Sequence, residues 1–258
     1  MRFVPASFAA AAGLLAAVTA VLHTPSAHSR QLSADGIQRP LPHAGDRKTV
    51  TRTLSAECRG VVLHTSDNVV IRQGKEASLT LTGPAEELER TSTVVEKGRL
   101  LITKTGNGKM NWTKGEGVTI TITLPTIESL AVNGSGDLKS DGTLTGAELA
   151  ISVAGSGDVQ VAAELTGALS TKLAGSGDVR LSGRCASHTV SVAGSGDVRA
   201  DALKASSATV KLSGSGDVSV AAADALDVSI SGSGDVRYAG APKQLVKRVT
   251  GSGSVARL

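Results

Sequence analysis

The chain has 258 residues, of which 40% are hydrophobic and 19% charged, a composition that favours a folded protein over a disordered one. Aromatic residues make up only 2%, which argues against a lectin that stacks sugars on exposed rings and against a platform for single-stranded nucleic acid. The net charge of +4 is small and evenly spread, so we expect no nucleic-acid partner.

Residues 1–29 predict a secretory signal peptide. A positive start at Arg2 precedes an apolar run from Phe8 to Leu22, and small residues follow with two plausible cleavage sites, after Ala20 and after Ser29. The alternative is an uncleaved anchor, but the run is shorter than the ~20 residues that a span needs. No later stretch is apolar enough to cross a membrane, so we expect an extracytoplasmic mature chain without a transmembrane segment. Residues 30–53 predict a disordered linker.

The only two cysteines, Cys58 and Cys185, lie in the mature chain. An oxidising compartment permits a disulfide between them, but their long separation in sequence leaves its formation open. A catalytic cysteine would need a base, and nothing in the sequence marks His43, His64 or His188 as the partner of either cysteine.

Residues 54–125 alternate between apolar and polar side chains, which is typical of strands. We interpret them as irregular first turns of the repeat that follows rather than as a separate domain. A basic insertion interrupts them and holds the only Trp of the chain, so Lys109, Trp112 and Lys114 are candidates for a contact loop, with packing of Trp112 over one end of the fold as the alternative. The expected strands are 58–64, 69–73, 78–82, 93–95, 100–105 and 118–124.

A tetrapeptide repeat dominates residues 126–258. Gly-Ser-Gly-Asp occurs six times, at intervals of 18 to 21 residues, and a seventh copy from Gly251 ends in Ser254 instead of Asp. Apolar residues occupy alternate positions on both sides of each copy, which is strand periodicity without a helical pattern. A period of about twenty residues predicts stacked turns, that is, an all-β parallel β-helix or solenoid. The copies begin at Gly134, Gly155, Gly175, Gly194, Gly214 and Gly232.

Both glycines of each copy fall on the inward parity of the strand. We expect the backbone to pass close to the solenoid axis there, leaving no room for a Cβ. Open strand edges at the two ends of such a solenoid predict self-association.

The aspartates of the motif should form one outward column with neighbours about 4.8 Å apart. Two interpretations compete. The column could bind Ca²⁺, or it could be a structural ladder neutralised by basic residues two positions further on and by hydrogen bonds from the serines of the motif. Because four of those six positions are Lys or Arg, we favour the ladder, and we expect no metal and no cofactor. The column comprises Asp137, Asp158, Asp178, Asp197, Asp217 and Asp235.

The order of these segments resembles the bacterial DUF2807 family, described as a putative auto-transporter adhesin head or GIN domain. The resemblance rests on residues 65–74, on 98–102 and on Leu124-Pro125 leading into the Gly-Ser-Gly-Asp copies. It implies a right-handed β-helix over residues 54–258 in an exported protein, and it supplies no catalytic residues.

We therefore expect a non-enzymatic interaction or adhesion module of the envelope or cell surface, with an unidentified protein or glycan partner. The rivals are a β-helical carbohydrate-active enzyme and a purely structural envelope protein without a discrete ligand.

Overall fold

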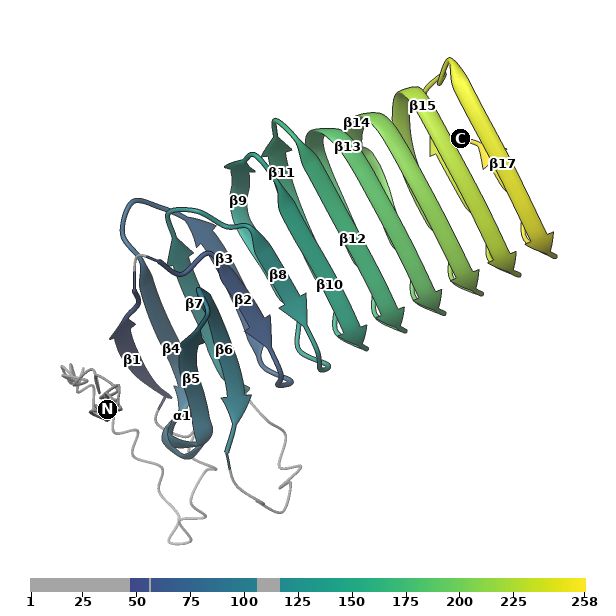
Figure 1. Ribbon diagram of the computed structural model, residues 1–258. Coiled ribbons are helices and arrows are strands. Elements are labelled where there is room, and N and C mark those ends of the chain that lie inside the picture. Colours follow the sequence, from purple (N-terminus) through teal and green to yellow (C-terminus); the bar gives the residue numbers. More distant parts are fainter. Residues whose placement is uncertain (1–46, 56, 106–116) are drawn as a thin grey trace, which may run out of the picture.

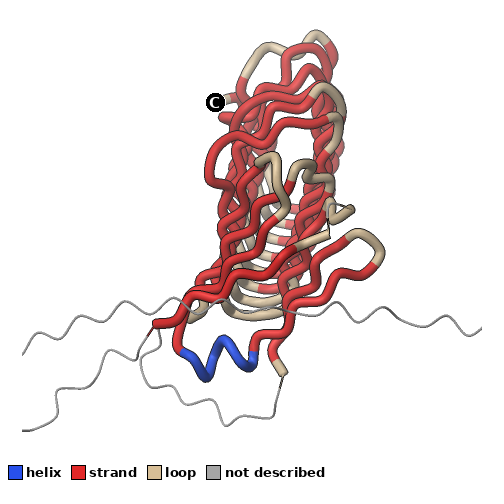
Figure 2. Tube along the Cα trace, turned by 90° about the vertical axis from the view of Figure 1, so that its left-hand side faces the viewer, coloured by secondary structure: helices blue, strands red, loops and turns tan. Residues whose placement is uncertain are grey.

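The computed structural model describes residues 47–55, 57–105 and 117–258, which form one elongated stack of β-coils (Figure 1). Each coil contributes one strand to each of two walls, and the walls enclose the core (Figure 2). The predicted parallel β-helix is confirmed. The signal peptide at 1–29 and the contact-loop residues Lys109, Trp112 and Lys114 lie outside the described residues.

The first wall consists of strands that precede the motif, and neighbours in it run parallel. In spatial order it comprises β6 (Arg99–Lys104), β2 (Gly60–Leu63), β8 (Ser129–Val132), β10 (Leu149–Gly155), β12 (Ala168–Gly175), the later parts of β13 (Val179–Gly194), β14 (Val198–Gly214) and β15 (Val218–Gly232), and finally β17 (Gln244–Gly251).

The second wall consists of the strands that follow the motif, and it is parallel as well. Its order is β7 (Thr119–Leu124), β3 (Asn68–Gln73), β9 (Leu138–Gly146), β11 (Val159–Leu165), the early parts of β13, β14 and β15, then β16 (Val236–Ala239) and β18 (Val255–Arg257).

The N-terminal end of the stack, where the sequence predicts irregular turns, mixes parallel and antiparallel strands. The chain forms the β2–β3 coil first, then adds the β6–β7 coil on its outer side, and only afterwards continues on the other side with β8 and β9. Antiparallel strands then close this end. They are β5 (Thr91–Glu96) on β6, β4 (Ser78–Pro84) on β7, and β1 (Arg47–Thr53) on β4.

Two further features of this end differ from the sequence-based expectation. Residues 47–53 belong to β1, so the predicted linker over 30–53 is wrong for them, and residues 30–46 lie outside the described part. A short helix, α1 (Ala85–Arg90), places Leu88 in the core at this end of the stack (Figure 2). Its signals are local: Pro84 precedes it, two glutamates occupy its first turn and Arg90 its last.

Aliphatic columns fill the interior between the walls, as the alternation predicts. In one column Ile151, Val190, Val210 and Val228 are at most 1% exposed. Thr171 lies between Ile151 and Val190 in that column and is also fully buried. Such a core needs few aromatic side chains because each coil adds the same apolar layer to the one before it.

The glycines of the motif are required by the neighbouring coil rather than by the axis. A Cβ on Gly175 would lie 2.1 Å from the carbonyl oxygen of Gly155, and its φ of +148° disfavours other residues. A Cβ on the second glycine, Gly177, would lie 2.1 Å from the carbonyl oxygen of Gly157. The predicted lack of room for a Cβ is confirmed, but its cause is close backbone contact between successive coils rather than crowding at the solenoid axis.

Candidate functional site

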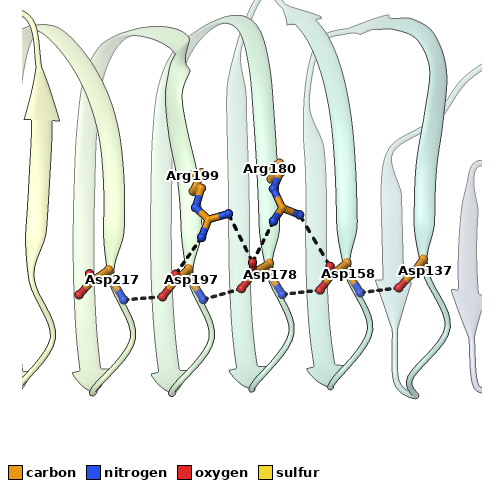
Figure 3. A network of polar contacts seen from close by, with 7 residues as sticks. All are labelled: Asp137, Asp158, Asp178, Arg180, Asp197, Arg199 and Asp217. Carbon is orange, nitrogen blue, oxygen red and sulfur yellow. Dashed lines mark hydrogen bonds and ion pairs between the residues drawn. The ribbon is translucent and has the colours of Figure 1, made fainter.

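The aspartates of the motif form a continuous ladder at the start of the second wall (Figure 3). Each carboxylate accepts a hydrogen bond from the main-chain N–H of the next aspartate in the column. The distances from N to Oδ1 are 3.0 Å for Asp158 to Asp137, 2.9 Å for Asp178 to Asp158, 3.3 Å for Asp197 to Asp178, 2.9 Å for Asp217 to Asp197 and 2.9 Å for Asp235 to Asp217. The aspartates therefore join coil to coil.

Arginines bridge the ladder at its centre (Figure 3). Arg180 lies 3.0 Å from Asp178 and 3.7 Å from Asp158, and Arg199 lies 3.2 Å from Asp197 and 3.5 Å from Asp178. Neighbouring carboxylates at ~4.8 Å repel each other by about 3 to 4 kcal/mol at an effective dielectric near 20. Each guanidinium offsets this repulsion for two carboxylates at once.

The serines of the motif do not form the hydrogen bonds to the aspartates that the sequence predicts. Those of the middle copies, Ser156, Ser176, Ser195 and Ser215, are exposed, and the ladder bonds come from main-chain N–H groups instead. Within the described residues, one serine hydroxyl donates to a ladder carboxylate, from Ser254 to Asp235 at 2.9 Å. The hydroxyl and N–H of Ser254 lower the pKa of Asp235 below its usual value.

No group of three or more His, Cys, Asp or Glu residues suited to a metal ion occurs in the part of the chain that the structure describes. The preference for a structural ladder over a Ca²⁺ site stays a prediction. We expect a melting temperature that EDTA does not change, and a fall that Ca²⁺ reverses would contradict this.

The two cysteines are both free and buried, so the disulfide that the sequence left open is not formed in this structure. Burial raises the pKa of Cys185 to about 11, and burial likewise raises the pKa of Cys58. Thiols of this kind stay protonated at neutral pH and make poor nucleophiles.

A charged cluster that the sequence analysis missed lies beside the β2–β3 coil. Thr65-Ser66-Asp67-Asn68 stacks on the first Gly-Ser-Gly-Asp copy, with Asp67 in the place of its second glycine. Asp67 is 1% exposed and lies 3.0 Å from Nζ of Lys104, which also contacts Glu87 at 2.6 Å. The hydrogen bond from Lys104 lowers the pKa of Glu87. The sequence carries only part of the signal: Thr65-Ser66-Asp67-Asn68 precedes its strand as the motif does, but Lys104 lies far from Asp67 along the chain.

A second polar pair lies in the core itself. The hydroxyl of Thr171 and Nε2 of His188 share a hydrogen bond of 3.0 Å, and His188 is only 2% exposed. Burial lowers the pKa of His188 to about 4, so the imidazole is neutral at pH 7. Both residues occupy positions that are aliphatic in most other coils, so we interpret the pair as a polar replacement within the core rather than as a functional site.

Comparison with known proteins places this geometry in a family. The family model described as "Putative auto-transporter adhesin, head GIN domain", DUF2807, matches residues 58–242, and the chain belongs to this family. No curated protein matches the chain.

Solved structures share the fold. A crystal structure of a putative adhesin from Bacteroides fragilis has 24% identity and a TM-score of 0.76, with 82% of this chain and 97% of that chain covered. A putative lipid binding protein from Parabacteroides distasonis has 26% identity and a TM-score of 0.65, with 83% and 98% covered. A putative adhesin from Parabacteroides merdae has 15% identity and a TM-score of 0.60. Within the described ranges of this chain, no helix is long and apolar enough to cross a bilayer.

Proposed function

We propose that the chain is an exported, non-enzymatic interaction module of the bacterial envelope or cell surface. The observation that carries this proposal is the solenoid itself: two regular walls with polar and charged outward side chains, joined coil to coil by the aspartate ladder, in a family described as an adhesin head. A rigid, regular surface suits contact with an extended partner because little conformational entropy is lost on binding.

The ladder also argues against the rival carbohydrate-active enzyme. A glycosidase needs one carboxylate that donates a proton and a second that attacks or activates water. Here Asp178 accepts a main-chain hydrogen bond and contacts two arginines, and Asp197 is engaged in the same way by Asp217 and Arg199. These contacts engage both carboxylates in joining one coil to the next.

The decisive experiment locates the protein and then tests attachment. Fractionation of the producing cells, followed by protease treatment of intact cells, should find the chain outside the cytoplasm. Deletion of the gene should reduce attachment to a glycan or protein surface. A deletion strain with a weakened envelope but normal attachment would favour a purely structural role instead. Hydrolysis of a polysaccharide that is lost in Asp178→Asn would favour the enzyme.

Self-association through the last coil is part of the same proposal. Every residue of β17 is exposed, including Leu245, Val246 and Val249, and no strand of the described chain pairs with its outer edge. Such edges recruit other strands. Light scattering over a wide concentration range should show a mass that grows with concentration, and a constant monomer mass would count against this part of the proposal.

A further inference from the structure

The outward face of the first wall differs from the ladder face. Its central column runs parallel to the stack, and from Ser152 onward a serine alternates with a cation from coil to coil. The register pairs each member with the next. The central column is Ala131, Ser152, Lys172, Ser191, Lys211, Ser229 and Arg248.

Two of these cations are free for a partner. Lys172 and Lys211 are exposed, and neither forms an ion pair or hydrogen bond with another residue of the described chain. Arg248 lies 2.8 Å from Asp227, which is the only carboxylate in the central column and the columns beside it, counted over the described strands β8 to β17. This face therefore carries a net positive charge, whereas the ladder neutralises itself.

The side chains beside the central column are short, so the face is flat. One neighbouring column is Ser129, Ala150, Ser170, Thr189, Thr209, Asp227 and Val246. The other is Ala154, Ala174, Ala193, Ser213, Ser231 and Thr250. The lysines thus rise from a low surface on which an extended chain can lie along the stack.

The spacing of the cations selects the partner. Lys172 and Lys211 are two coils apart, and Arg248 follows after two more, so the positive charges recur about every 9.6 Å. One residue of an extended polysaccharide advances the chain by roughly the spacing of neighbouring strands, ~4.8 Å. A polysaccharide with a carboxylate on alternate sugars would therefore bring one carboxylate to each cation. Its neutral sugars would lie over Ser191 and Ser229, whose hydroxyls both donate and accept hydrogen bonds.

We propose that the outward face of the first wall binds an extended acidic polysaccharide that carries one carboxylate per two sugars, with Lys172, Lys211 and Arg248 as its anion contacts. The inference rests on the proposed function, since it names the partner of the same module. A nucleic acid fits less well, because its phosphates are more closely spaced and the face offers no aromatic ring for stacking.

The test uses hyaluronan oligosaccharides, in which glucuronate alternates with a neutral amino sugar, titrated calorimetrically into the full mature chain. Wild type should bind, and added salt should weaken binding. The double variant Lys172→Gln/Lys211→Gln should bind about tenfold more weakly. Asp227→Asn should bind more tightly, because it removes the opposing carboxylate and releases Arg248. The matched control Lys139→Gln/Lys204→Gln removes two exposed lysines elsewhere and should leave affinity unchanged.

Any of three results with the sugars would overturn the inference: no binding of hyaluronan by wild type, equal affinity of the Lys172/Lys211 variant, or equal binding of uncharged chitin oligosaccharides. Stronger binding of polyglutamate would do the same, since it would show charge attraction without the two-coil spacing. Failure of the proposed function itself is distinguishable, because it would appear as normal attachment of the deletion strain whatever the purified protein binds.

Discussion

Acidification should destabilise this solenoid through a single core residue, His188. The unfolded chain protonates this histidine near pH 6.5, whereas burial lowers the pKa in the folded protein to about 4. Between these values the unfolded state binds a proton that the folded state does not, so stability falls as pH falls. Above pH 6.5 the residue is neutral in both states and contributes no pH dependence.

The gap between 6.5 and about 4 corresponds to about 3 kcal/mol of unfolding free energy. Solvent does not weaken this effect of burial, because His188 is only 2% exposed and its neighbours in the column are the aliphatic Leu169 and Ala208. A loss of this size is a large fraction of the 5–15 kcal/mol that typically holds a domain together.

The assay is urea unfolding of wild type and of Thr171→Val/His188→Leu between pH 4 and 8. The double variant restores the aliphatic residues that occupy these columns in other coils, so it removes the titrating group without leaving the hydroxyl unpaired. The difference in unfolding free energy between the two proteins should be constant above pH 6.5 and should change by about 3 kcal/mol by pH 4. A difference that does not vary with pH would refute the reasoning.

Substitutions at three further places test the stacking of the coils. Asp197→Ala should lower the unfolding free energy by about 1–3 kcal/mol, because it removes the acceptor of a main-chain N–H, and Asp197→Asn, which keeps an oxygen there, should cost less. Equal losses in urea unfolding would show that charge matters more than the acceptor. Gly196→Ala places a methyl group 2.1 Å from a carbonyl oxygen of the previous coil and should cost about 1–3 kcal/mol or more, whereas Gly146→Ala, whose Cβ would have its nearest neighbour at 3.8 Å, should be near neutral. Similar melting temperatures for the two variants would contradict the close contact. Lys247→Val should raise the mass measured by light scattering, because Lys247 occupies the place of core Val228 and donates to the carbonyl of Val255, an inward charge that discourages further stacking. An unchanged mass would exclude that role.

Most of the solenoid could be predicted because each copy of the repeat carries the same alternation of apolar and polar residues around Gly-Ser-Gly-Asp. The alternation around residues 149–161 predicted which side chains point inward and which outward. The basic residues two positions after each aspartate predicted the ion pairs of Arg180 and Arg199. The donors to the aspartates were missed because main-chain N–H groups leave no mark in a sequence.

The closed N-terminal end was predicted less well because it depends on spatial order rather than local pattern. The expected strands over 58–124 are present, but periodicity carries no information on whether a neighbour runs parallel or antiparallel, so the reversed pairing of β4 and β5 was not foreseen. The excursion of the β6–β7 coil separates Asp67 from Lys104 along the chain and hides their contact.

The glycine contacts make the coils interchangeable modules. Gly175 meets Gly155 in the same way as Gly194 meets Gly175, so the main-chain contacts of the motif are the same from coil to coil. Removal or duplication of about twenty residues, counted from one motif to the next, would restore an equivalent junction and change only the length of the rod. A change in the number of repeats therefore alters the length of such a protein without a change in its core.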